Sequence, residues 1–130
     1  MKAHSTVSSK HQNAVFDALA ENCFDSVMIS EATAKNPIVY VNKAFTDLTG
    51  YSAEEVLGKS PSFLQGPDTD ASVVQRLQAD MAAERVFEGK AVNYRKNGSR
   101  FTMWWRVIPV ALNSDKPEYF VAFQRENLIS

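Results

Sequence analysis

Three adjoining β-like segments near the C-terminus constrain the fold of this 130-residue chain more than any other feature. We predict strands over residues 86–96, 100–112 and 119–126. Lys96-Asn97-Gly98-Ser99 joins the first two, and Asn-Gly is the strongest short sequence signal for a β-hairpin. Turn-forming residues at 113–117 join the second and third. The sequence therefore predicts a three-stranded meander.

The first two-thirds of the chain adds two strands and several short helices. Residues 26–30 and 38–41 are short and rich in β-branched side chains, and Asn36-Pro37 between them indicates a turn, so we predict a second hairpin. Apolar spacing and capping residues predict helices at 10–21, between Asn42 and Gly50, and at 52–57, 60–65 and 71–83. Residues 1–9 are small and polar, and we expect them to form a mobile tail.

These elements predict one α+β domain: a five-stranded antiparallel sheet with short helices on one face and an N-terminal helical cap. One side of the central meander strand carries Phe101, Met103, Trp105 and Val107, and the other carries Thr102, Trp104, Arg106 and Ile108. Neither side is polar, and the helices cover only one. The N-terminal helix or a second subunit must cover the other. We favour a homodimer, because a helix of about 12 residues covers only part of such a sheet.

Charge and composition exclude several classes of function. The net charge is −1, so no surplus of basic residues is present to neutralise nucleic-acid phosphates. The single cysteine, Cys23, and the two histidines, His4 and His11, supply too few groups for a metal cluster or a Ser-His-Asp triad. No apolar run approaches the ~20 residues of a membrane span, and no signal-peptide pattern opens the chain. We expect a cytoplasmic protein without a membrane, metal or nucleic-acid partner.

Several motifs resemble the PAS family of sensor domains. Residues 38–45 (IVYVNKAF), 48–52 (LTGYS) and 54–58 (EEVLG) are similar to the first half of a PAS domain. Residues 63–70 (FLQGPDTD) and 93–98 (NYRKNG) resemble the light-oxygen-voltage (LOV) subclass. This resemblance covers residues 24–126 and implies a PAS fold, blue-light sensing and flavin mononucleotide (FMN) as cofactor. We accordingly divide the chain into a tail and cap helix (1–22), a PAS/LOV-like core (23–126) and a C-terminal tail (127–130).

The photochemical position of the LOV motif is substituted in this chain. LOV domains carry G-x-N-C-R-F-L-Q, whose cysteine bonds to the flavin carbon C4a after light absorption, and the matching residues here are GKSPSFLQ at 58–65. Pro61 replaces the cysteine, and Ser60 and Ser62 replace its two neighbours. Proline has no nucleophile, and the only thiol, Cys23, precedes the first strand. The resemblance therefore predicts a LOV-like domain that forms no cysteinyl-flavin adduct.

The other flavin contacts of the family are only partly present. The two arginines that hold the phosphate correspond to Ser62 and Gln78, with Lys59 or Arg106 as candidate substitutes. Of three amides that bind the ring edge, two match and one has become Met103. The candidate cofactor-binding residues are Gln65, Asn93, Gln124, Ser60, Ser62, Gln78, Met103 and Trp105. We expect the amides of Gln65, Asn93 and Gln124 to point inward and Trp105 to fill space. This favours an internal hydrogen-bond network or an altered ligand over tight FMN binding.

Three functional hypotheses follow. The leading one is a stand-alone sensory module that signals through a homodimer contact formed by the outer sheet face and the N-terminal helix. The predicted contact residues are Trp104, Ile108, Tyr119, Val121, Phe123, Val15, Phe16 and Leu19. The second is a flavin photoreceptor that works by electron transfer from Trp105 or Tyr40. The third, an enzyme, is least favoured because no base, nucleophile and orienting residue come together.

Overall fold

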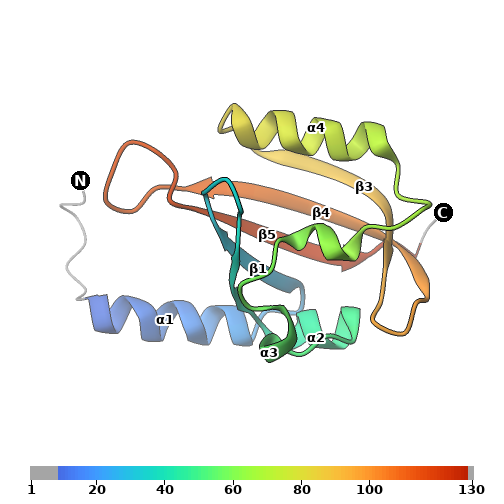
Figure 1. The fold of residues 1–130 in the computed structure, drawn as a ribbon. Coiled ribbons are helices and arrows are strands. Elements are labelled where there is room, and N and C mark those ends of the chain that lie inside the picture. Colours follow the sequence, from blue (N-terminus) through green and yellow to red (C-terminus); the bar gives the residue numbers. More distant parts are fainter. Residues whose placement is uncertain (1–8, 129–130) are drawn as a thin grey trace.

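All five predicted strands form, and they build one antiparallel sheet (Figure 1). The structure, a computed structural model, describes residues 9–128. The strands are β1 (Ser26–Glu31), β2 (Ile38–Val41), β3 (Phe87–Tyr94), β4 (Arg100–Val110) and β5 (Tyr119–Glu126). Their order in the sheet is β2-β1-β5-β4-β3. The predicted α+β class is confirmed, while the predicted tails at 1–8 and 129–130 lie outside the described residues.

The helices form where the capping residues predict them. They are α1 (Ser9–Glu21), α2 (Lys43–Thr49), α3 (Ala53–Val56), the 3-10 helix η1 (Pro61–Leu64) and α4 (Ala71–Ala82). Ser52 and Glu55 form the predicted capping box of α3. Asp70 begins α4, and hydrogen bonds from the Ser72 side chain and backbone hold the pKa of this carboxyl below its ordinary value. Within residues 9–128, no helix is both long enough and apolar enough to cross a membrane.

The hairpin between β3 and β4 is shorter in its paired part than predicted. The register runs from Phe87 opposite Val107 to Tyr94 opposite Arg100, so residues 95–99 form the turn. Gly98 occupies the left-handed region with φ of 87°, which glycine adopts without strain. The backbone N–H of Lys96 donates to the carbonyl of Thr49 at 2.8 Å, so the turn is bound to the end of α2 instead of extending the ladder.

The main core lies on the inner face of the sheet, against α2, α3, η1 and α4. Its sheet residues include Phe87, Ala91, Phe101, Met103, Trp105, Val107, Phe120 and Ala122, all of them buried. The predicted inward side of β4 is therefore confirmed. α4 packs over β3 but none of its twelve residues is buried. This helix therefore covers the sheet without sealing against it, and a space remains beside it.

The outer face of the sheet is only partly covered. Ala20 of α1 is buried against Val27 and Ile29 of β1, with Cys23 and Tyr40 packed at the same cluster. The sequence favoured an apolar helix face made by Val15, Phe16 and Leu19, but in the structure the side chains of Val15 and Leu19 are 55% and 70% exposed. The helix touches the sheet mainly through its last turn, because the chain enters β1 directly after it. The predicted outer-face residues Trp104, Ile108, Tyr119, Val121 and Phe123 are half-buried.

Candidate functional site

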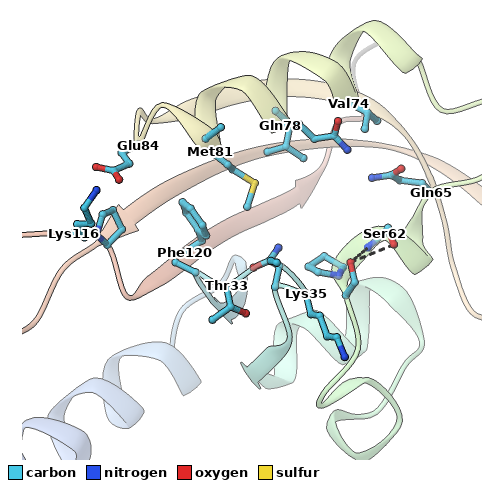
Figure 2. Close-up of a pocket in the computed structure, with 18 residues that line it drawn as sticks. Thr33, Lys35, Ser62, Gln65, Val74, Gln78, Met81, Glu84, Lys116 and Phe120 are labelled. Carbon is cyan, nitrogen blue, oxygen red and sulfur yellow. Dashed lines mark hydrogen bonds between the residues drawn. The ribbon is translucent and has the colours of Figure 1, made fainter.

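A cleft of about 610 Å³ opens between α4, η1 and the loop that joins β1 to β2 (Figure 2). We call it the α4 cleft. Its apolar surface comes largely from Val74, Leu77 and Met81 of α4 and from Phe120 of β5. Its volume lies within the range of about 300–1,000 Å³ that is typical of small-molecule sites. The cleft lies beside a helix that crosses the sheet with none of its residues buried.

Four of the predicted site residues line this cleft: Ser60, Ser62, Gln65 and Gln78. Ser60 caps η1 by accepting from the backbone N–H of Ser62, and Pro61 occupies the first turn, where its missing N–H costs nothing. The N-terminal end of η1 therefore lines the cleft, opposite Gln78 on α4 (Figure 2). Gln65, predicted as an inward amide, is solvent-exposed at the cleft, because it follows the last turn of η1 and leaves the core.

Trp105 lines a smaller inner pocket of about 50 Å³, together with Met28, Val107 and Ala122 of the sheet. Its indole packs against Phe87, with ring centroids 5.0 Å apart and an interplanar angle of 50°. The ring of Phe87 in turn lies 4.8 Å below the guanidinium of Arg76. This stack occupies the space between the sheet and α4. The inner pocket therefore has room for about one water molecule and is too small to hold a ring system.

The structure places the other three predicted residues, Asn93, Met103 and Gln124, in the core, and none of them lines the α4 cleft or the inner pocket. The Oε1 of Gln124 accepts from the hydroxyl of Ser26 at 2.8 Å. The Nδ2 of Asn93 donates to the carbonyl of Ala91 at 3.4 Å. The predicted set of eight is thus split: four residues line the cleft, one lines the inner pocket, and three lie within the protein.

Asn36 is a site residue that the sequence analysis did not identify. It lines both the α4 cleft and the inner pocket. In the described part of the chain, its Oδ1 is the one buried side-chain nitrogen or oxygen without a hydrogen-bond partner. Its φ of 49° lies in the left-handed region, which asparagine tolerates better than most residues. In the sequence, Asn36-Pro37 indicated only a turn. Nothing in that dipeptide predicted that the Asn36 side chain would line a cleft.

The cations that were candidates for holding a phosphate point elsewhere. Lys59 lies 6.0 Å over the ring of Phe63 and does not line the cleft. Arg106 pairs with Glu88 on the outer face of the sheet. The charged residues that do line the cleft, Lys35, Lys116 and Glu84, are exposed at its rim. The geometry therefore does not support Lys59 or Arg106 as replacements for the two phosphate-binding arginines of the family.

Comparison with known proteins places this arrangement in a family. A family model described as "PAS domain" matches residues 25–127. A "Blue-light-activated histidine kinase 1" of Erythrobacter litoralis is 44% identical over 88 residues, which are 68% of this chain and 24% of that protein. "Phototropin-2" of Oryza sativa subsp. japonica is 39% identical over 100 residues, 76% of this chain and 11% of that protein. The chain therefore spans about a quarter or less of these relatives.

A solved structure gives the same assignment at the level of one domain. The "LOV domain from Erythrobacter litoralis EL346 blue-light activated histidine kinase" superposes with a TM-score of 0.75 at 34% sequence identity. The match covers 78% of this chain and 94% of that domain. The chain thus belongs to the PAS family and is a sensory domain of the light-oxygen-voltage type, related to the blue-light photoreceptors.

Proposed function

We propose that this chain is a sensory module in which the α4 cleft binds a flavin-type ligand more weakly than, or differently from, its LOV relatives. The observation that carries this proposal is the cleft itself, which joins an apolar helix surface to hydroxyl and amide groups from the motif at 60–65. Asn36 also lines this space, and its buried Oδ1 has no hydrogen-bond partner within the described residues. The residues that line the α4 cleft therefore fit a flavin.

The ring-edge amides support an altered mode of binding. Gln124 is engaged with Ser26, and Asn93 lies in the core beside Met103. Trp105 is the cross-strand neighbour of Gln124 and packs against Phe87. Neither amide lines the α4 cleft. We infer that the ring edge is bound from the loop at Asn36 instead of from the sheet.

We further propose that no cysteinyl-flavin adduct forms. Pro61 lines the cleft at the position where the LOV motif carries its cysteine. Among the residues that the structure describes, Cys23 is the only thiol, and it packs with Ala20 and Val27 at the opposite face of the sheet. Because the attack requires a thiolate in contact with the ring, the five-stranded sheet separates the nucleophile from its target.

Signalling through a homodimer is the output that we propose. The outer face presents half-buried Trp104, Ile108 and Phe123, and α1 adds the exposed Val15 and Leu19. Exposed apolar residues gathered on one face are typical of an interface. The match covers only 24% of the Erythrobacter litoralis kinase, so this proposal concerns sensing and not catalysis.

A second candidate function is flavin photoreduction without an adduct. The observation that favours it is the position of Trp105, which lines the inner pocket directly below the α4 cleft. An indole beside a bound flavin is an electron donor within short range. Tyr40, the other predicted donor, packs with the cluster on the opposite face of the sheet and hydrogen-bonds to Glu21, so its position does not support this role.

The test is a flavin titration of the full chain followed by blue illumination, read by flavin fluorescence and absorbance. We expect saturable binding, and bleaching by blue light that is the same in the Cys23→Ser variant. Binding with bleaching that Cys23→Ser abolishes would contradict the absence of an adduct. A loss of photoreduction in Trp105→Phe would support the second candidate. Failure to bind riboflavin, FMN or lumiflavin would overturn the proposed function.

A further inference from the structure

The charges around the α4 cleft are distributed unevenly (Figure 2). One end carries Ser60, Ser62, Gln65 and Gln78, which are all uncharged hydrogen-bonding groups. The opposite end carries Lys116 and Glu84, whose opposite charges lie at the same rim. Lys35 belongs to the joining loop, and its Nζ points away from α4. The end that is best supplied with hydrogen-bonding groups thus has no formal charge.

From this distribution, and resting on the proposed function, we infer that the α4 cleft selects an uncharged flavin of the riboflavin type over FMN. A ribityl chain presents hydroxyls that both donate and accept. These match hydroxyl and amide side chains, which also donate and accept.

A phosphate would gain little in this cleft. Removing a dianion from water is costly unless cations replace its hydration, and charge-assisted hydrogen bonds from arginine are about twice as strong as neutral ones. In the lining that the structure describes, no arginine is present. Arg76, which lies on α4 two residues before Gln78, donates to the carbonyl of Glu88 at 2.7 Å and covers Phe87. It is therefore committed to the β3 edge and unavailable to the cleft.

The rim lysines do not change this balance. Lys35 and Lys116 are exposed, and an ion pair formed at a solvated surface contributes only about 0–1 kcal/mol. At the end that holds Lys116, the carboxylate of Glu84 repels a phosphate as well. The uncharged end is thus the favourable place for a polar tail, and it favours a tail of hydroxyls.

The decisive measurement compares the dissociation constants of riboflavin, FMN and lumiflavin for the full chain by fluorescence titration at low and high salt. We expect riboflavin to bind about two- to tenfold more tightly than FMN, with the preference decreasing at high salt as charge effects are screened. A dissociation constant for FMN equal to or below that of riboflavin would overturn the inference and leave the proposed function intact. Absence of binding by all three flavins would overturn both.

A gain-of-charge variant tests the assigned end of the cleft. Ser62→Arg combined with Gln78→Arg places two guanidinium groups on facing walls of the uncharged end. We expect the ratio of FMN affinity to riboflavin affinity to rise about tenfold or more, because the new guanidinium groups bind the phosphate and the replaced hydroxyl and amide no longer bind the ribityl chain. The matched control is Gln75→Arg with Ala79→Arg, which adds the same charge to exposed positions of α4 outside the cleft. Equal gains in the two double variants would show a general charge effect and overturn the inference.

Discussion

Two helices lie on opposite sides of the sheet, and they are held in opposite ways (Figure 1). α4 is bound along the β3 edge, where Arg76 donates to the carbonyl of Glu88 and Thr69 donates to that of Val92. α1 is bound mainly at its C-terminal end, where Asn42 donates to the carbonyl of Ala20 at 2.7 Å and the ring of Phe16 lies edge-on to that of Tyr40. A helix fixed along an edge keeps a cleft open beside it. A helix that is fixed at one end leaves its exposed apolar side chains free to contact another surface.

The neighbouring tryptophans of β4 give the largest expected difference between the two sides. Trp105 is 6% exposed and packs against Phe87, so Trp105→Ala removes core volume and should lower the free energy of unfolding by about 3–5 kcal/mol. Trp104 lies on the outer face between Arg106 and Arg125, with cation–π distances of 5.9 and 5.4 Å. Trp104→Ala should cost less than about 2 kcal/mol, as expected for contacts at a solvated surface.

Urea denaturation at one fixed protein concentration measures both losses, since dimer formation makes stability depend on concentration. Equal losses would contradict the contrast between a buried tryptophan on the inner face and a half-buried one on the outer face. Trp105→Ala also enlarges the inner pocket. A tighter flavin complex in this destabilised variant would identify the indole as the group that keeps a ring out of the sheet-lined space.

Asn42 is the residue that attaches α1 to the core, and it gives the second largest effect. Its Oδ1 accepts from the backbone N–H groups of Val27 and Phe45, and its Nδ2 donates to the carbonyls of Ala20 and Asp25. Asn42→Ala leaves these buried groups without partners, which we expect to lower the free energy of unfolding by about 2–3 kcal/mol.

The same variant should also release the last turn of α1, which is seen as faster amide hydrogen exchange in residues 14–21 than in α4. The control is Lys43→Ala at the next position, which removes an exposed i,i+4 pair with Asp47 and should cost less than about 0.5 kcal/mol. Unchanged exchange in α1 would mean that the packing of Ala20, and not the Asn42 side chain, holds the helix.

The exposed side of α1 gives a test of the proposed dimer. Leu19 is 70% exposed, and burial of a leucine contributes roughly 1.5–3 kcal/mol. Leu19→Glu should therefore weaken self-association at least about tenfold, measured by light scattering over a range of concentrations. Gln75→Glu places the same charge on the exposed side of α4 and should leave association unchanged. A monomeric parent protein at high concentration would contradict the dimer itself.

The fold was predictable because its determinants are local in sequence. Asn97-Gly98 sets a turn, Ser52 and Glu55 make a capping box, and alternation along β4 separates Met103 and Trp105 from Trp104. Errors at strand ends were one or two residues, as at β3. There a tertiary hydrogen bond from Lys96 to Thr49 overrides the local pattern.

The candidate site was less predictable because its shape depends on how α4 stands over the sheet. Motif position alone grouped Gln124 and Asn93 with Ser62, yet both amides are buried in the core and neither lines the cleft. The helix periodicity likewise identified the apolar side with Leu19 but not Ala20 as the residue that packs on the sheet. The short connection from Cys23 into β1 instead turns Ala20 toward the sheet. Both differences arise from contacts between elements that no local pattern encodes.

The smallest expected effect concerns the contact of Tyr40 with α1. Burial, together with the hydrogen bond to Glu21 and the repulsion from that carboxylate, raises the pKa of the Tyr40 phenol. The folded protein then holds this proton more tightly than the unfolded chain does. The contribution to stability is fully present below pH about 10 and decreases as the pH rises beyond it. Tyr40→Phe should cost about 0.5–1.5 kcal/mol at neutral pH, for the lost hydrogen bond, and should reduce the decrease in stability above pH about 10.

Glu21→Gln separates the two causes, because it keeps an acceptor for the phenol and removes the negative charge. Its stability at neutral pH should stay close to that of the parent protein, while its decrease at alkaline pH should fall between those of the parent and Tyr40→Phe. Urea denaturation at pH 8 and pH 11 provides the comparison. Identical alkaline profiles in all three proteins would mean that α1 is already detached from Tyr40 in solution. The contrast between a helix held along an edge and one held at its end would then be greater than the structure indicates.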